Sequence, residues 1–416
     1  MYKRTQYYSS KDLKDFQKKK LEAILEHAII NVPFYKTFNL SKSTDVFECL
    51  KTFPIIDKNI IRDNFKNFTA LGINPKLVIP NSTSGSTGQN FKFLSHKNSH
   101  GQALQIRQDE WVGKKLFEKE IKIWGSTFDL KKSGKLIPKI KQKFKRTIIL
   151  SGYNLSDEKI AEYIKTINKV KPKLLHSYPS ILYLLAIHIE KNHIEMAQMN
   201  IKSAGEKLFP FQRDKIESVF KTKIFDFYGA RDIPMVAHEC EQHQGLHVMM
   251  ENVYLEVLDQ NDQPIEEGEG DLVLTDLNNF AMPFIRYRIG DRAQISKRNC
   301  ACGRGLTLIE EVIGRTFEII QFPNGNRVGG TFWTFVLKSV PGILDFQVIQ
   351  QNQFQIDINY ICDEKFNPSN IDFKTILKHI NEYSGTELNI YFKEVETIEP
   401  TKGGKHLFVI TKIKKL

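Results

Sequence analysis

The stretch KPKLLHSYPSILYLLAIHIE, residues 171–190, indicates the fold class of the chain. Its first apolar run, at Leu174 and Leu175, is short and ends in a polar turn, which is typical of a buried strand. Pro179 then stands where proline favours the first turn of a helix, and a long apolar segment follows it. A strand that leads into a helix is the building unit of an α/β domain.

The same alternation continues on both sides of this stretch. Apolar residues at helical spacing predict helices over 11–31, 57–68 and 156–170. Asp57 and Ser156 are the predicted N-caps of the last two. Apolar and β-branched runs predict strands over 76–80, 223–229, 251–259 and 271–277. We therefore predict an α/β fold with a large multi-layer N-terminal domain, residues 1–314, that contains mixed sheets.

The composition changes near residue 313. A helix is expected over 371–384, among four segments that have the character of strands: FEIIQF (317–322), FQVIQ (346–350), FQIDINYI (354–361) and LNIYFKEV (388–395). This pattern predicts a small α+β domain over residues 315–416. Because no low-complexity linker precedes it, we expect a hinge near Arg315–Ile319 rather than a long tether.

The composition is that of a globular protein of two or three domains. The chain has 416 residues, of which 41% are hydrophobic and 26% are charged. No apolar run approaches the roughly 20 residues of a membrane helix, and the N-terminus lacks the apolar core of a signal peptide. Five cysteines do not make a disulfide scaffold. We therefore expect a cytoplasmic protein.

The charge balance favours anionic partners. The net charge is +12, and one dense cluster, KKSGKLIPKIKQKFKR, spans Lys131 to Arg146. This cluster has two interpretations: a solvated lysine-rich surface, or a docking patch for a phosphate-rich ligand or an anionic membrane. No recognisable nucleic-acid module is present, so nucleic-acid binding would rest on net charge alone and is not expected. The oligomeric state is left open.

A polar, glycine-rich segment, NSTSGSTGQNFKF, spans residues 81–93. Consecutive hydroxyl and N–H groups with glycines between them form anion-binding loops, although the P-loop pattern is absent. By itself the segment fits a phosphate site and an unliganded Ser/Gly loop equally well. Its candidate ligand-binding residues are Thr83, Ser84, Gly85, Ser86, Thr87, Gly88 and Lys92.

Five further motifs follow this segment in a fixed order: SAGEKL (203–208), DFYGARD (226–232), FIRYRIGD (284–291), GRTFEII (314–320) and PTKGGK (400–405). Together with TSGSTG they resemble the motif series of the adenylate-forming superfamily, which includes acyl-CoA synthetases and adenylation domains. Each motif alone is weak, but six in order over the whole chain are specific.

Three more segments are similar to the phenylacetate–CoA ligase branch and its capsule-biosynthesis relatives: KLEAILEHAIINVPFYK (20–36), FPIIDKNIIRDNF (53–65) and HSYPSILYLLA (176–186). The resemblance runs from about Leu21 to the end. It implies an AMP-forming acid–thiol ligase, in which a carboxylate and MgATP give an acyl-adenylate and coenzyme A takes the acyl group. The capsule relatives leave a second acceptor open, an amine or hydroxyl of a glycan.

The resemblance also implies roles for single residues. The loop residues and Lys92 would hold the ATP phosphates, Tyr228 would stack on adenine, and Gly229 would lie in the same nucleotide-binding element. Asp291 would accept the ribose hydroxyls, as a carboxylate with two acceptor oxygens can. The adenine pocket would be lined by Ala204, Gly205 and Glu206. Without the motif series, Tyr228 and Asp291 would be an ordinary strand aromatic and a turn residue.

Three residues are implied in catalysis. Lys405 would neutralise charge at the α-phosphate, and Arg315 would reach the ribose or α-phosphate from the hinge. Asp232 stands where the family has a Mg²⁺-contacting Glu and is one methylene shorter. That departure keeps a rival open, a degenerate nucleotide-binding protein without activity. A second departure, FWTF at 332–335, puts the thiol acceptor in doubt.

The acid itself is poorly defined by the sequence. An aryl acid would need an apolar pocket, which we expect from Trp124–Phe128, Tyr178 and Tyr228. No sequence feature separates an aryl acid from other acyl, hydroxy or amino acids.

Cysteine and histidine residues suggest a zinc site. Cys300 and Cys302 form a C-x-C pair in RNCACGRG, and Cys240 lies in HECEQHQGLHV. Zinc prefers four N/S ligands in structural sites, and some members of the phenylacetate–CoA ligase branch look similar here and carry a structural zinc. The predicted ligands are Cys240, His247, Cys300 and Cys302, with His243 and His238 as rivals for the histidine. The alternative is three unliganded thiols; Cys49 and Cys362 are expected to pack in the core.

Overall fold

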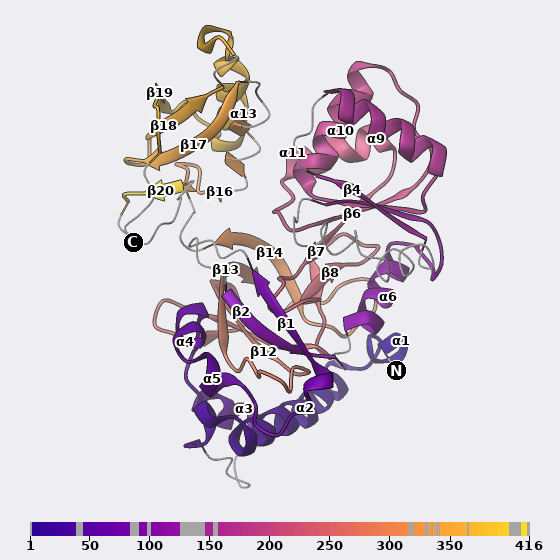
Figure 1. Cartoon of the computed structure of the whole chain (residues 1–416), viewed down its shortest axis with the longest axis vertical. Helices are drawn as coiled ribbons and strands as arrows, with labels where there is room; N and C mark the ends of the chain where they lie inside the picture. Colours follow the sequence, from indigo (N-terminus) through magenta and orange to yellow (C-terminus); the bar gives the residue numbers. More distant parts are fainter. Residues whose placement is uncertain are drawn as a thin grey trace.

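The computed structural model in Figure 1 describes most of the chain. The described residues are 2–38, 45–83, 91–97, 101–124, 146–152, 157–315, 320–328, 332–333, 336–337, 340, 342–363, 366–398 and 409–413. None of the helices in these ranges is long and apolar enough to cross a membrane.

The helices are α1 Tyr2–Thr5, α2 Ser10–Asn31, α3 Val46–Lys51, α4 Lys58–Asp63, α5 Phe65–Phe68, α6 Gly101–Trp111, α9 Asp157–Val170, α10 Pro179–Lys191, α11 Pro210–Phe220 and α13 Phe373–Ser384. Short 3-10 helices lie at η1 Pro33–Tyr35, η2 Pro75–Leu77 and η3 Pro368–Asn370.

The strands are β1 Val78–Thr83, β2 Phe91–His96, β3 Glu120–Trp124, β4 Thr147–Ser151, β5 Leu174–Ser177, β6 Asn200–Ala204, β7 Ile224–Tyr228, β8 Ala237–Glu239, β9 Leu246–Val248, β10 Val253–Leu258, β11 Pro264–Ile265, β12 Gly268–Asp276, β13 Tyr287–Ile295, β14 Leu308–Arg315, β15 Ile320–Gln321, β16 Arg327–Val328, β17 Ile343–Gln350, β18 Gln355–Cys362, β19 Asn389–Glu394 and β20 Val409–Thr411.

One twelve-stranded sheet organises most of the molecule, in the order β11-β10-β12-β13-β14-β9-β8-β7-β6-β5-β3-β4. From β4 to β7 the strands are parallel, and from β7 to β11 they are antiparallel. Helices α9, α10 and α11 pack on one face of the parallel half (Figure 1). The predicted α/β fold with mixed sheets is thus confirmed.

The stretch around Pro179 folds as its sequence predicts. Leu174 and Leu175 are both fully buried in β5, because a parallel strand has other elements on both of its faces. Helix α10 begins at Pro179, whose missing N–H costs nothing in the first turn.

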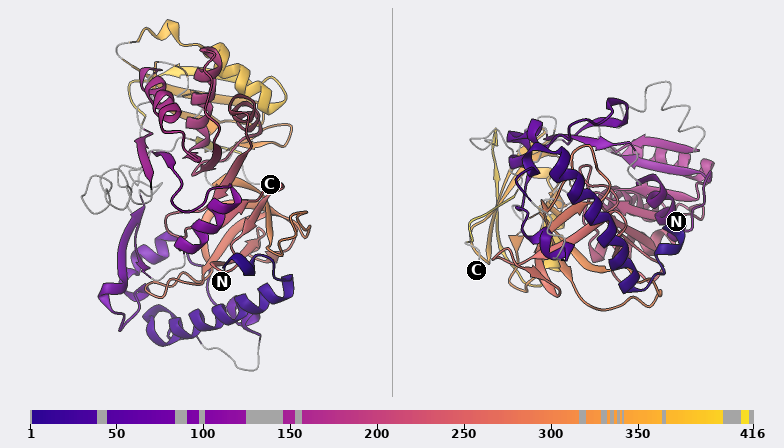
Figure 2. Two further views of the ribbon diagram at one scale, coloured as in Figure 1. Left: turned by 90° about the vertical axis from the view of Figure 1, so that its right-hand side faces the viewer. Right: turned by 90° about the horizontal axis from the view of Figure 1, so that it is seen from below.

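The antiparallel half is covered by the N-terminal segments. Helix α2, which was predicted over 11–31, buries Leu21, Ile24 and Leu25 in the core that also contains Tyr287 (Figures 1 and 2). The strands β1 and β2 form a separate two-stranded ribbon.

The single helix predicted over 57–68 is wrong. The structure has two short helices, α4 and α5, with Asn64 between them at φ −119°, outside the helical region. The Asp57 cap is correct: its carboxylate accepts the N–H groups of Asn59 and Ile60 at 2.8 and 2.9 Å. The predicted cap Ser156 lies outside the described residues, and the helix after it is α9.

The C-terminal residues form a four-stranded sheet, β19-β18-β17-β20, with α13 packed on it. The predicted strands over 346–350, 354–361 and 388–395 correspond to β17, β18 and β19. Within the described part of FEIIQF, only Ile320–Gln321 is a strand.

This C-terminal sheet module lies against the helices of the parallel half (Figure 1, top; Figure 2, left). The Phe209 ring, at the start of α11, contacts Phe332 and Tyr383, each at 5.4 Å between centroids. The two units therefore share one apolar core in this conformation.

Candidate functional site

The carboxyl ends of the parallel strands carry residues predicted for the acid pocket and for the adenine pocket. Trp124 ends β3, Tyr178 follows β5, Gly205 follows β6 and Tyr228 ends β7. Because neighbouring parallel strands end at the same edge of a sheet, these residues from four segments converge there. Such an edge is where open α/β sheets bind ligands.

Gly205 is held against an aromatic pair. The rings of Trp124 and Tyr178 stack at 4.5 Å between centroids. Gly205 has φ +82°, and a Cβ atom there would lie 2.8 Å from the Tyr178 ring. Only glycine combines this conformation with this close approach. The motif SAGEKL therefore provides a flat backbone surface beside two rings.

Glu206 ties the same turn to helix α10. Its carboxylate accepts the Ser180 N–H at 3.1 Å, in the first turn of the helix. Burial raises the pKa of Glu206. The contact fixes the position of the Ala204–Gly205–Glu206 backbone rather than offering a free carboxylate to a ligand.

Tyr228 and Asp291 meet across the molecule. The Tyr228 hydroxyl donates to Asp291 Oδ2 at 2.8 Å, joining β7 to β13. Asp291 is paired with Arg315 in the register of β13 and β14. The structure thus brings Tyr228 and Asp291 into contact and places the backbone of Arg315 beside Asp291. The side chain of Arg315 lies outside the described residues.

Asp232 is buried, with 3% of its surface exposed, and has two partners. The Tyr287 hydroxyl donates to its Oδ2 atom at 2.5 Å, and Lys58 Nζ lies 3.3 Å from the same oxygen. Burial and the Asp232 charge raise the pKa of Tyr287 well above its usual range. The carboxylate therefore has a cationic partner and a hydrogen-bond donor on the same oxygen.

Sequence reasoning missed Lys58 as a site residue. It is the first residue of α4, directly after the cap Asp57, and its ammonium also lies 5.9 Å from the centre of the Phe91 ring. The sequence indicated Lys58 only through its place in the FPIIDKNIIRDNF segment. A lysine one residue after a helix cap is otherwise an ordinary exposed residue.

The β1–β2 ribbon places the phosphate-loop candidates near Asp232. Thr83 ends β1 opposite Phe91, and Lys92 is opposite Ser82. Arg231 Nη1 donates to the Ser82 carbonyl at 3.4 Å, which links the ribbon to the DFYGARD motif. The Thr83 hydroxyl is buried without a hydrogen-bond partner among the described residues, and so is available to a ligand oxygen. Outside the described residues lie Ser84, Gly85, Ser86, Thr87, Gly88 and Lys405.

A second cluster lies in the antiparallel half. The ligand atoms of Cys240, His247, Cys300 and Cys302 all lie within 4.8 Å of one another. The Cys240 and Cys300 sulfurs are 3.6 Å apart, and Cys302 Sγ is 3.3 Å from His247 Nε2. A tetrahedral zinc ion holds such ligand atoms about 3.5–3.8 Å apart. The four residues therefore fit a closed structural zinc site.

The geometry separates His247 from its rivals. Burial and Arg304 lower the pKa of His247 to about 4, which keeps the ring neutral as a metal ligand requires. His243 instead lies 3.0 Å from Glu239 Oε2, and His238 Nδ1 lies 2.5 Å from the Glu239 carbonyl. Neither rival belongs to the four-residue group.

Backbone groups support the sulfur atoms of this cluster. The Gln242 N–H donates to Cys240 Sγ and the Arg304 N–H to Cys302 Sγ, each at 3.5 Å. The Arg304 side chain stacks on Trp111 at 4.5 Å and donates to Gln6 at 2.9 Å. The cluster thus connects the N-terminal segment and helix α6 to the sheet.

Comparisons with known proteins agree with this arrangement. Residues 320–412 match the family model of the CapK C-terminal domain. Protein CapK of Staphylococcus aureus is 25% identical over 97% of this chain and 90% of its own length. A phenylacetate-coenzyme A ligase of Thermus thermophilus is 27% identical over 47% of this chain and 45% of its own length.

The chain is a homologue of CapK and of the phenylacetate–coenzyme A ligases. Among solved structures, 2-hydroxyisobutyryl-CoA ligase in its postadenylation state has a TM-score of 0.69, with 16% identity, 98% of this chain covered and 91% of that chain. The chain therefore has the fold of the CoA ligases, and the predicted resemblance to the phenylacetate–CoA ligases and their capsule-biosynthesis relatives is confirmed.

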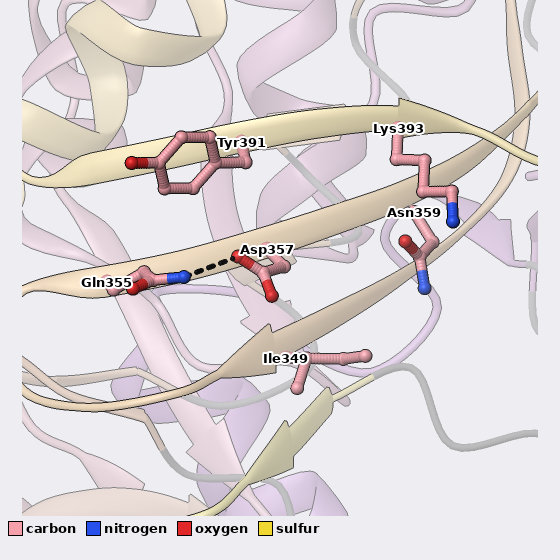
Figure 3. Close-up of a pocket in the computed structure, with 6 residues that line it drawn as sticks. All are labelled: Ile349, Gln355, Asp357, Asn359, Tyr391 and Lys393. Carbon is pink, nitrogen blue, oxygen red and sulfur yellow. Dashed lines mark hydrogen bonds between the residues drawn. The ribbon is translucent and has the colours of Figure 1, made fainter.

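A shallow depression in the C-terminal sheet lies apart from both clusters of this CapK homologue (Figure 3). Its polar lining includes Gln355, which donates to Asp357 at 3.1 Å, with Tyr391 and Lys393 on the neighbouring strand. None of the predicted site residues lines it, and the convergent chemistry lies at the edge of the large sheet.

Proposed function

We propose that the protein is an AMP-forming carboxylate ligase. It would activate a carboxylic acid with MgATP to an acyl-adenylate and transfer the acyl group to coenzyme A. The homology to phenylacetate–coenzyme A ligases and the CoA-ligase fold support both steps. Because ATP and coenzyme A are cytoplasmic, we place the reaction in the cytoplasm.

One observation carries this proposal: Tyr228 at the end of β7 donates to Asp291 of β13, beside the turn at Gly205 that follows the neighbouring strand β6. The Gly205 backbone and the Tyr228 ring offer a flat surface for adenine. Asp291, oriented by Tyr228, offers two oxygens to ribose hydroxyls.

The phosphates would lie at the other side of this group. Thr83, Lys92 and the loop residues 84–88 would bind the β- and γ-phosphates, and Lys405 and Arg315 would act at the α-phosphate. Mg²⁺, when bound, would supply positive charge to the leaving pyrophosphate. Asp232 is the proposed ligand, and Lys58 beside it would hold the carboxylate in place and add a second positive charge.

We further propose a structural zinc ion in the Cys240, His247, Cys300 and Cys302 cluster. Four ligands close the coordination sphere, so zinc would have no open position for catalysis. Its effect would be to hold the C-x-C loop against the strand that carries His247.

The chain division 1–314 and 315–416 is also a proposal. Residues 315–416 would act as a lid that delivers Lys405 for adenylation and turns about the Arg315–Phe317 hinge for acyl transfer. The CapK C-terminal model over 320–412 supports a separate module there. The aromatic contacts of Phe209 would then have to break in each cycle.

A second acceptor is supported by the CapK relationship, which extends over 97% of the chain. In that version an amine or hydroxyl of a glycan takes the acyl group in place of coenzyme A. The adenylation half-reaction is the same in both versions.

ATP–pyrophosphate exchange across a panel of carboxylic acids tests the proposal. We expect exchange that depends on one class of acid, and its loss by at least 100-fold in Lys405→Ala, as for removal of one transition-state contact. Folded protein that binds ATP but exchanges with no acid would contradict the enzyme and favour a non-catalytic nucleotide-binding protein. Thioester formation with coenzyme A then separates the two acceptors.

A further inference from the structure

The two faces of the parallel strands differ sharply beneath Trp124 and Tyr178. On the face under α9, α10 and α11, the residues are apolar, as in Ile123, Leu175 and Ile201. On the opposite face, Lys122, His176 and Lys202 are side by side, because they are register partners in β3, β5 and β6. Strands β3 and β5, which lead to the acid pocket predicted at Trp124 and Tyr178, therefore carry buried charge on one face.

Helix α6 completes this polar cluster. Lys202 Nζ lies 2.5 Å from Asp109 Oδ1, and Lys114 lies 3.3 Å from the other oxygen of Asp109. Glu120 lies 3.5 Å from Lys122 and 3.6 Å from His176 Nδ1. We call this group, Asp109, Lys114, Glu120, Lys122, His176 and Lys202, the polar floor.

His176 lies against the aromatic pair at the edge of the sheet. Its ring centre lies 5.3 Å from that of Trp124, edge to face, and Trp124 in turn stacks on Tyr178. His176 is two residues before Tyr178, which is about 7 Å along the strand. The imidazole thus lies directly below the aromatic pair that faces Gly205.

The His176 ring also lacks a hydrogen-bond partner. Only 7% of its surface is exposed, and neither ring nitrogen makes a hydrogen bond within the described part of the chain. Buried polar atoms without partners are rare, because each loses its hydrogen bonds to water and gains none in the protein. Because Nδ1 faces the Glu120 carboxylate, we assign the ring proton to Nδ1. Nε2 is then a hydrogen-bond acceptor.

We infer that the acid substrate carries a distal hydroxyl group, which donates to His176 Nε2 on the polar floor. This inference rests on the proposed function and names its substrate class. Burial and Lys202 lower the pKa of His176 to about 4, so the ring is neutral at pH 7 and accepts a hydrogen bond. The chemistry selects a hydroxy acid over an unsubstituted aliphatic or aryl acid.

The groups around His176 favour a hydroxyl over other distal groups on the acid. A second carboxylate would face the Nε2 lone pair, which repels it. An ammonium group would add a positive charge beside Lys122 and Lys202, where lysines already outnumber carboxylates in the floor, three to two. A hydroxyl donates one hydrogen bond without bringing a charge, and its oxygen can accept one from a lysine.

Four acids that share one carbon chain test this inference: butyrate, 4-hydroxybutyrate, 4-aminobutyrate and succinate. Phenylacetate and 4-hydroxyphenylacetate form an aryl pair. In ATP–pyrophosphate exchange we expect 4-hydroxybutyrate to exceed butyrate, and 4-hydroxyphenylacetate to exceed phenylacetate, by at least tenfold in kcat/KM. The acid without a hydroxyl leaves His176 Nε2 unpaired, which lowers its kcat/KM. His176→Leu should bring both ratios close to one, and His176→Gln should restore part of the preference.

His188→Leu is the matched control, because His188 is in the same strand–helix unit, on α10, and has no place in the polar floor. Circular dichroism and AMP binding show whether each variant is folded. A preference for butyrate, succinate, 4-aminobutyrate or phenylacetate would contradict this inference but not the proposed function. An unchanged kcat/KM ratio in folded His176→Leu protein would do the same. Exchange with no acid at all would overturn the proposed function and this inference with it.

Discussion

The large sheet carries two buried polar groups on one face. They are the thiol–imidazole cluster, which consists of Cys240, His247, Cys300 and Cys302, and the polar floor, and both contact helix α6. Trp111 of α6 contacts His247 at 5.7 Å between rings, while Asp109 of α6 pairs with Lys202. The first group has four ligand atoms that point at one centre and suit a closed site. The second has ion pairs around an imidazole whose Nε2 atom has no hydrogen-bond partner among the described residues. Under our proposals, buried polar atoms would hold a structural metal in the first group and recognise the substrate in the second.

Removal of one thiol should break the first cluster and give the largest effect. In Cys300→Ser we expect the zinc content to fall from about one equivalent to near zero and the free energy of unfolding to fall by roughly 3–5 kcal/mol, because binding of a structural metal is coupled to folding. Metal analysis and urea unfolding measure the two effects. Cys362→Ser, outside the cluster, should change neither; equal zinc content in both variants would contradict the site.

Asp232→Asn tests the buried carboxylate at the nucleotide end. We expect about 100-fold slower ATP–pyrophosphate exchange and a higher Mg²⁺ requirement, because the neutral amide no longer offers a charged ligand. Titration of Mg²⁺ in the exchange assay measures both. Asp262→Asn, an exposed residue that pairs with Arg288, is the control. An unchanged Mg²⁺ requirement would assign Asp232 to a structural role with Tyr287 and Lys58.

The buried imidazole should make stability depend on pH. The folded protein holds His176 neutral with its pKa near 4, whereas the unfolded chain takes up a proton near pH 6.5. The stability contributed by this group is present above pH 6.5 and is lost as the pH falls toward 4. Relative to His176→Leu, wild-type protein should lose roughly 2 kcal/mol more between pH 7 and pH 4.5 in urea unfolding. If the free energy of unfolding of wild-type protein and of His176→Leu fell in parallel with pH, the prediction would be wrong and the His176 ring would be accessible to water.

Gly205→Ala should have the smallest effect. The added Cβ atom would meet the Tyr178 ring at 2.8 Å in a backbone conformation that alanine disfavours. We expect KM for ATP or the acid to rise about tenfold, since the aromatic pair must move, which corresponds to roughly 1.4 kcal/mol. Gly72→Ala is the control: it has φ +71° with no atom within 4 Å, so it should lose stability without a change in KM.

The sequence was informative where a residue acts through its immediate neighbours. Asp57 caps α4 and Pro179 starts α10 as predicted, because a cap or a first-turn proline depends on two or three adjacent residues. The prediction failed at 57–68, where Asn64 leaves the helical conformation and separates two short helices. Apolar spacing alone did not reveal that break.

The candidate zinc ligands were only partly predicted from the sequence. The C-x-C pair and Cys240 stand out in composition, but three histidines competed for the fourth place. Strand register decided among them: His238 and His247 are partners across β8 and β9, and only the ring on β9 reaches the thiols. A choice of this kind depends on which strands pair, and spacing along the chain does not contain that information.

By itself the sequence determined the α/β class, the order of the nucleotide motifs and the residue types of the metal cluster, since these follow from local patterns and composition. Only the tertiary structure brought Lys58 to Asp232 and placed His176 on a charged floor below Trp124. Lys58 is 174 positions from Asp232 along the chain, and Lys202, Asp109 and Glu120 come from a helix and two strands. Long-range burial creates these partnerships, because a lysine or histidine acquires its function from the groups that exclude water around it.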